Sequence, residues 1–96
     1  MIIVGDIGNT ETKICLIDSK KNIIKRVIFN TKKIKLALLK NQLSDLNLKN
    51  HLIEKCLFCS VVPKSFNNIK FFIEKNYRIK CHELKMLKLN KLIKVK

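Results

Sequence analysis

The sequence predicts an α/β fold in which a mixed five-stranded sheet has helices on its faces and the elements follow the order β-β-β-α-β-α-β. Three observations lead to this prediction. Residues 1–30 contain three short apolar segments separated by polar turns. After Thr31 the apolar residues recur at helical spacing, and Pro63 separates a later apolar run from a second helical pattern.

The opening segments have the composition of paired strands. Residues 2–6 are apolar almost throughout, which is typical of a central, buried strand. Turn-forming residues 8–10 lead to a second apolar strand over residues 13–18. The polar loop 19–22 is short enough for a hairpin, and residues 23–29 are rich in β-branched side chains. Together they predict a three-stranded antiparallel meander.

The period of the apolar residues changes after the meander. Residues 31–46 have helical spacing with Thr31 as the expected N-cap, and residues 47–50 form a polar break. Residues 55–62 predict a fourth strand. Because two right-handed crossovers would follow the meander, we expect this strand to lie beside the first.

A second helix and a fifth strand complete the prediction. Pro63 ends the fourth strand and suits the first turn of a helix that continues to about residue 76. Residues 78–84 alternate weakly and predict a strand. The tail, residues 85–96, is either an amphipathic end or an unfinished strand.

Length and composition are those of one small globular domain. The chain has 96 residues, and 47% of them are hydrophobic, which argues against disorder. No apolar run approaches the ~20 residues that span a bilayer, and Met1 is followed at once by Ile2 rather than by a basic segment. We therefore expect a cytoplasmic protein without a signal peptide or membrane contact.

The net charge of +14 leaves two explanations open. The 21 Lys and Arg against 7 Asp and Glu suit nucleic acid or an acidic membrane surface as a partner. Lys is spread along the whole chain beside abundant Ile and Asn, however, which favours a compositional bias of the genome. Proteins that bind RNA through a sheet display aromatic residues on it, whereas most aromatics here fall in or beside a predicted helix. The sequence therefore disfavours nucleic acid.

The cysteines and histidines predict no metal or catalytic centre. The cysteines, which we expect to be reduced core residues, are Cys15, Cys56, Cys59 and Cys81. Cys56 and Cys59 have the spacing of half a zinc site, but residues three apart in a strand face opposite sides. His51 and His82 lack a paired carboxylate motif, so we expect neither to act in catalysis.

Residues 4–13, VGDIGNTETK, hold both glycines of the chain beside short polar side chains. Gly8 allows a sharp turn in which successive N–H groups form an anion-binding nest. Asp6, at the carboxyl end of a central strand, suits Mg²⁺ held against phosphate oxygens, because a carboxylate cannot bind phosphate directly. A plain hairpin in which Asp6 caps a turn explains the same residues, so the spacing alone leaves both interpretations open.

DIGNTETK resembles the first phosphate motif of the superfamily that contains acetate and sugar kinases, actin and heat-shock-type chaperones. With CSVVPKSFNNI (59–69) and LNKLIKV (89–95), the chain resembles the type III pantothenate kinases over residues 1–95. Those kinases have a duplicated ribonuclease H-like fold. The resemblance implies that residues 1–96 are the N-terminal half-domain and that the C-terminal half is absent from this sequence.

The resemblance also implies the chemistry of the opening turn. Asp6 would orient Mg²⁺ indirectly, and the family uses ATP with a monovalent cation, K⁺ or NH₄⁺. Its members phosphorylate pantothenate to 4'-phosphopantothenate, the first step of coenzyme A synthesis, and pair as homodimers; a complementary C-terminal half is the other partner expected here. The implied ATP phosphate loop consists of Asp6, Ile7, Gly8, Asn9, Thr10, Glu11, Thr12 and Lys13.

Departures from the family pattern limit the expected activity. Glu11 replaces an uncharged or basic residue and would repel phosphate unless it points away, and Gly5 replaces a larger apolar residue. The family's catalytic base is an Asp in a Gly-Ala-Asp-Arg segment, whereas no Asp or Gly follows Leu46 here. We therefore expect a truncated kinase with no catalytic residue of its own, inactive alone.

Three further interpretations stay open. Ser60 borders the substrate cleft by resemblance, or it is a packed hydroxyl at the end of a strand. The whole chain is alternatively a basic nucleic-acid-binding module. It is also alternatively a non-catalytic remnant that acts as an interaction partner.

Overall fold

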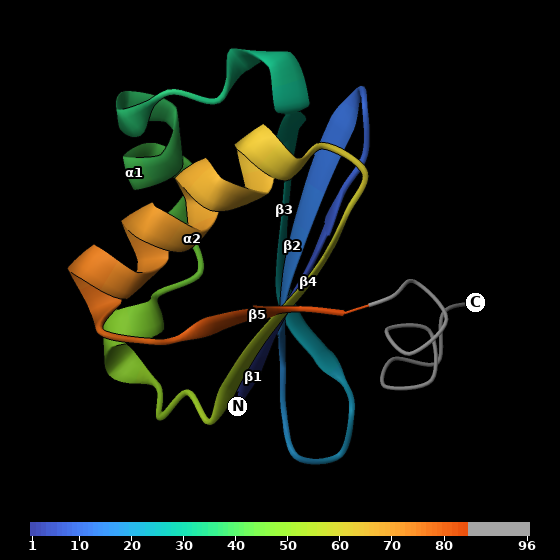
Figure 1. Cartoon of the computed structure of the whole chain (residues 1–96). Coiled ribbons are helices and arrows are strands. Elements are labelled where there is room, and N and C mark those ends of the chain that lie inside the picture. The colour runs from blue at the N-terminus through green and yellow to red at the C-terminus, as the bar shows by residue number, and fades with distance from the viewer. Residues whose placement is uncertain (85–96) are drawn as a thin grey trace.

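The computed structural model describes residues 1–84 and has the α/β fold that the sequence predicts (Figure 1). Within residues 1–84, two α-helices lie against a five-stranded sheet. Two single 3₁₀ turns, at Thr31–Lys33 and Leu48–Asn50, precede and follow the first of these helices. The strands and helices are β1 (Ile2–Ile7), β2 (Glu11–Ile17), β3 (Ile23–Asn30), α1 (Leu36–Ser44), β4 (Lys55–Ser60), α2 (Pro63–Tyr77) and β5 (Cys81–Glu83).

The sheet is mixed, and β1 lies at its centre. The strand order is β3-β2-β1-β4-β5. The meander β1-β2-β3 is antiparallel, whereas β4 pairs with β1 and β5 pairs with β4 in parallel. This arrangement confirms the predicted neighbours β1 and β4, and it is consistent with a ribonuclease H-like half-domain.

Both helices cover the same face of the sheet, which corrects the expectation of helices on its faces (Figure 1). The chain crosses from β3 to β4 through α1 and from β4 to β5 through α2. The two crossovers run in the same direction across the sheet. Because right-handed crossovers in one direction stay on one side, α1 and α2 are neighbours rather than opposing layers.

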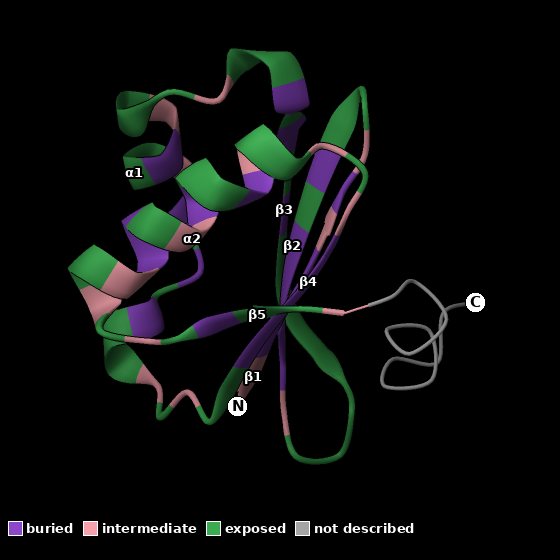
Figure 2. Cartoon of the chain, in the orientation of Figure 1, coloured by how far each residue is buried: buried purple, intermediate pink, exposed green. Residues whose placement is uncertain are grey.

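The buried side chains form two clusters, one on each face of the sheet. Figure 2 shows buried residues along the strands and on the side of the helices that faces the sheet. The larger cluster lies between the helices and the sheet and contains Ile3 and Ile7 of β1. The smaller cluster, on the other face, consists of Val4, Cys15, Ile17 and Cys59. Successive strand residues point to opposite faces, so Asp6 lies on the face of this second cluster.

Gly5 lies on the helix-covered face of the sheet, where close packing explains why a glycine stands at this position. A Cβ at Gly5 would bring three ring carbons of Phe58 closer than 3.0 Å. Phe58 pairs with Gly5 in the β1–β4 register and is fully buried. A larger residue at this position would therefore displace the Phe58 ring.

The helix predicted over residues 31–46 is shorter than expected, and Thr31 is not its N-cap. Helix α1 begins at Leu36 after an extended Lys35 that makes no side-chain cap. The preceding 3₁₀ turn is capped by Asn30, whose Oδ1 accepts the Lys32 N–H at 2.9 Å. The Thr31 hydroxyl is instead paired with that of Thr12, and Thr31 precedes Lys35, the residue at the N-cap position of α1.

Strands β4 and β5 are also shorter than predicted. Strand β4 ends at Ser60 because the Ser60 hydroxyl bonds to both the N–H and the C=O of Val62, at 2.9 Å each, and turns the chain into α2. After α2, Arg78 adopts the left-handed conformation at φ 55° and redirects the chain, so β5 begins only at Cys81. The predictions for residues 85–96 lie outside the described residues.

Candidate functional site

The candidate phosphate site lies at the carboxyl end of the central strand. Asp6 is the penultimate residue of β1, and residues 8–10 connect β1 to β2 as predicted. The Gly8 N–H donates to the Glu11 carbonyl at 2.9 Å and closes this hairpin. Gly8 does not adopt a positive φ, so the expected conformational reason for a glycine is wrong. Instead, a Cβ at Gly8 would lie 3.2 Å from the Glu11 carbonyl oxygen, which is a tight approach.

The predicted phosphate-contacting residues fall on two faces of the sheet. Ile7 and Thr12 are fully buried beneath the helices, so only their backbone groups are available to a ligand. Asp6 is half-buried on the opposite face, and Gly8, in the connection between β1 and β2, is also half-buried. The exposed members of the loop are Asn9, Thr10, Glu11 and Lys13.

Asp6 has a charged neighbour and a thiol neighbour on its own face. Its register partners are Lys13 on β2 and Cys59 on β4. Burial raises the pKa of the Cys59 thiol, and the negative charges of Asp6 and Glu83 raise this pKa further. Glu11 shares this face of β2 with Lys13, so its carboxylate adds negative charge on the side where a phosphate would approach Asp6.

The donor set around Asp6 fits Mg²⁺ that is shared with a ligand. Residues 1–84 contain no cluster of three or more His, Cys, Asp or Glu side chains able to hold a metal by themselves. Mg²⁺ usually keeps several waters and is bound through one or two carboxylates together with substrate phosphates. A single carboxylate at the end of β1 meets that requirement.

Ser60 lies at the same edge of the sheet as Asp6. It ends β4 and pairs with Ile7 of β1. Its half-buried hydroxyl already forms hydrogen bonds with the Val62 backbone, as expected of a packed hydroxyl at the end of a strand. A role at the border of a substrate cleft stays a prediction.

Comparison with known proteins shows which family the chain belongs to. Residues 2–96 match the family model described as type III pantothenate kinase. The chain belongs to the type III pantothenate kinase family. It is 70% identical, over all 96 residues, to a curated type III pantothenate kinase from Pelagibacter ubique (strain HTCC1062), and it spans 39% of that relative's length.

One close pair of cysteines in this pantothenate kinase homologue was not predictable from the sequence. All four cysteines are free and buried, and Cys56 and Cys59 face opposite sides of the sheet, as predicted. The Cys56 Sγ, however, lies 3.1 Å from the Cys81 Sγ, because these residues are partners in the β4–β5 register. The bond to Cys81 and burial both raise the pKa of the Cys56 thiol. No signal in the sequence could set this register.

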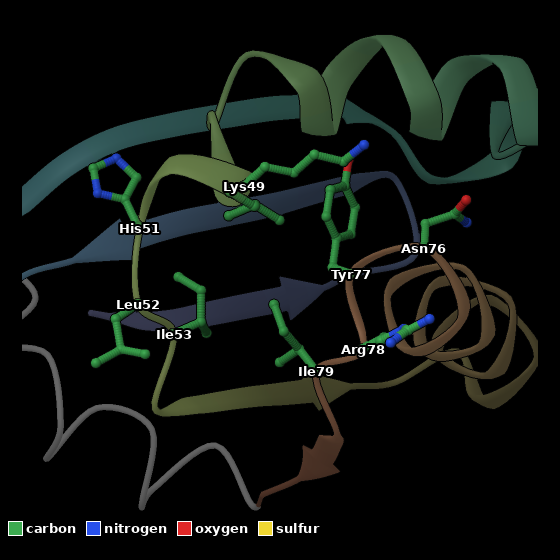
Figure 3. Close-up of a pocket in the computed structure, with 9 residues that line it drawn as sticks. Lys49, His51, Leu52, Ile53, Asn76, Tyr77, Arg78 and Ile79 are labelled. Carbon is green, nitrogen blue, oxygen red and sulfur yellow. The ribbon is translucent and has the colours of Figure 1, made fainter.

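A hollow of about 410 Å³ lies at the other end of the sheet, away from the hairpin (Figure 3). It is formed by the segment around the second 3₁₀ turn and by the turn after α2. Its polar lining includes Lys49, His51 and Arg78, and burial raises the pKa of the Tyr77 hydroxyl beside them. Its apolar lining includes Leu48. The predicted phosphate loop contributes no residue to it.

The length and apolar character of the two described helices decide whether either of them could cross a membrane. Over residues 1–84, neither helix combines the length and the apolar character needed to cross a bilayer.

Proposed function

We propose that this chain is the N-terminal, ATP-binding half-domain of a type III pantothenate kinase. The whole enzyme would transfer a phosphoryl group from ATP to pantothenate and form 4'-phosphopantothenate for coenzyme A synthesis. The family match over residues 2–96 carries this proposal. The position of Asp6, at the carboxyl end of a central strand and followed by a tight polar hairpin, supports it.

In this proposal the hairpin binds the ATP phosphates. Backbone N–H groups of the connection at residues 9 and 10 and the exposed side chains of Asn9, Thr10 and Lys13 donate to phosphate oxygens. The Asp6 carboxylate orients Mg²⁺, partly through its bound waters. When bound, Mg²⁺ neutralises phosphate charge; K⁺ or NH₄⁺ as a second ion rests on the family resemblance alone.

Catalysis requires more than these residues. Phosphoryl transfer needs a group that orients the attacking hydroxyl, and the resemblance assigns that role to a Gly-Ala-Asp-Arg segment that this sequence does not contain. We therefore propose that pantothenate binding and turnover depend on a complementary C-terminal half. We further propose a homodimeric assembly and a cytoplasmic location.

Calorimetric titration of the chain with ATP, in the presence and absence of Mg²⁺, tests the nucleotide site. We expect Asp6→Asn to weaken Mg²⁺–ATP binding by about tenfold or more, the effect of losing one charged contact. Without Mg²⁺ the same variant should bind ATP no more weakly than the wild type, because a negative charge next to phosphate has been removed. Asp18→Asn is the matched control, since Asp18 lies at the far end of β2, where it bonds to the loop of the second hairpin.

A coupled kinase assay with pantothenate tests the half-domain proposal. We expect no turnover by the chain alone and turnover when a C-terminal half from the family is added. If the chain alone phosphorylated pantothenate and Asp6→Asn abolished this turnover, the result would contradict the proposal that the chain lacks the catalytic base. If the wild type and Asp6→Asn bound Mg²⁺–ATP with equal affinity, the result would contradict the proposed role of Asp6 in the nucleotide site. Tight, salt-sensitive RNA binding without ATP binding would favour the nucleic-acid alternative.

A further inference from the structure

Two buried hydroxyls join the hairpin to the end of β3. Thr12 Oγ1 lies 2.8 Å from Thr31 Oγ1, although the residues are 19 apart in the chain. Thr12 is 0% exposed and Thr31 is 4% exposed. One hydroxyl donates and the other accepts, in a place where water cannot replace either partner. Removing one hydroxyl therefore leaves the other buried without its partner.

Thr31 holds the hairpin at a second point. Its backbone N–H donates to the Thr10 carbonyl at 2.9 Å. Thr10 belongs to the connection between β1 and β2, whereas Thr12 lies in the first residues of β2. The two contacts of Thr31 therefore span the part of the hairpin that follows Gly8, whose own N–H bond to Glu11 closes the loop.

Thr31 is itself held firmly by the fold. It is buried at the junction between β3 and the 3₁₀ turn, and Asn30 Oδ1 fixes that turn through the Lys32 N–H. A side chain anchored in this way can transmit the position of β3 to the hairpin. A loop that is already ordered loses less conformational freedom when it binds a ligand, which strengthens binding.

We propose that Thr31 is a positioning residue for the phosphate hairpin, acting through its paired hydroxyl with Thr12. It sets the hairpin, residues 8–12, relative to Asp6 on β1. The consequence for nucleotide affinity rests on the function proposed above, whereas the consequence for the order of the hairpin does not.

The test uses the 96-residue chain with Thr31→Val and Thr31→Ser. Valine keeps the shape of the side chain and the backbone bond to Thr10 but removes the hydroxyl; serine restores it. For Thr31→Val we expect amide hydrogen exchange at Gly8 and at residue 31 to rise about tenfold relative to the β1–β4 ladder. The dissociation constant for Mg²⁺–ATP should rise by a similar factor. Thr31→Ser should bring both values back to within about threefold of the wild type.

Val27→Ala is the matched control. Val27 is buried in β3 on the same face of the sheet, so its truncation lowers the melting temperature without touching the hydroxyl pair. The proposal is overturned if Thr31→Val and Val27→Ala lower the melting temperature alike and leave hairpin exchange and ATP affinity equally unchanged. If the wild-type chain binds no Mg²⁺–ATP while hairpin exchange follows the pattern above, the positioning role stands and the proposed nucleotide function falls.

Discussion

Gly5→Ala is the smallest change that tests how the site strand packs. The added methyl group would overlap the Phe58 ring, three of whose carbons would lie closer than 3.0 Å. Phe58 has no exposed surface, and its ring contacts Phe66 at a centroid distance of 6.0 Å. The ring therefore cannot swing into solvent, and either it or strand β1 must shift.

Overpacking of a well-filled core costs about 1–3 kcal/mol, and we expect the upper part of this range because the displaced ring is fully buried. In a domain of this size 1 kcal/mol shifts the melting temperature by about 4–8 °C, so Gly5→Ala should melt about 10–20 °C lower. Urea denaturation followed by circular dichroism measures the loss in the free energy of unfolding.

Gly8→Ala is the control for this prediction, since its Cβ would meet a single atom, the Glu11 carbonyl oxygen, at 3.2 Å. We expect it to cost less than about 1 kcal/mol. Phe58→Leu, which shortens the opposing side chain, should reduce the cost of Gly5→Ala. The reasoning is refuted if Gly5→Ala unfolds at the same urea concentration as the wild type. It is also refuted if the cost is the same in the Phe58→Leu background.

Three other changes have directions that the structure determines. Glu11→Gln should strengthen Mg²⁺–ATP binding a few-fold, because it removes a screened repulsion of up to about 1 kcal/mol, and unchanged affinity in a titration would show that the side chain points away. Arg78→Gly should raise the free energy of unfolding by about 0.5–1 kcal/mol, since Arg78 holds the left-handed φ of 55°, whereas Arg78→Ala, which keeps the Cβ, should not. The raised pKa of Cys56 stabilises the fold below the ordinary thiol pKa of 9.0, and this stability should be lost as the pH rises above it. Between pH 8 and pH 10 the wild type should lose about 1.4 kcal/mol more of its free energy of unfolding than Cys56→Ala does, measured by urea denaturation.

Local chemistry made much of this fold predictable from the sequence. Pro63 and the apolar stripe after it predicted α2 almost to its last residue, because a helix is determined by residues within a few turns. The polar loop after Asp18 predicted the second hairpin, where the Asp18 carboxylate accepts two backbone N–H groups. The placement of Asp6 at the carboxyl end of β1 followed from the same short-range signals.

The features that only the tertiary structure decided involve residues far apart in the chain. Thr31 is of a residue type that is favoured at helix N-caps. Its hydroxyl bonds to Thr12, 19 residues away in the chain, and helix α1 starts later, at Leu36. The sequence shows Gly5 only as a departure from the family pattern, and its packing against Phe58 depends on the pairing of β1 with β4. Cys56 meets Cys81 only through the pairing of β4 with β5. Such contacts depend on strand register and on which face each crossover covers. Both are settled by the packing of the whole sheet against its helices, and no window of neighbouring residues contains that information.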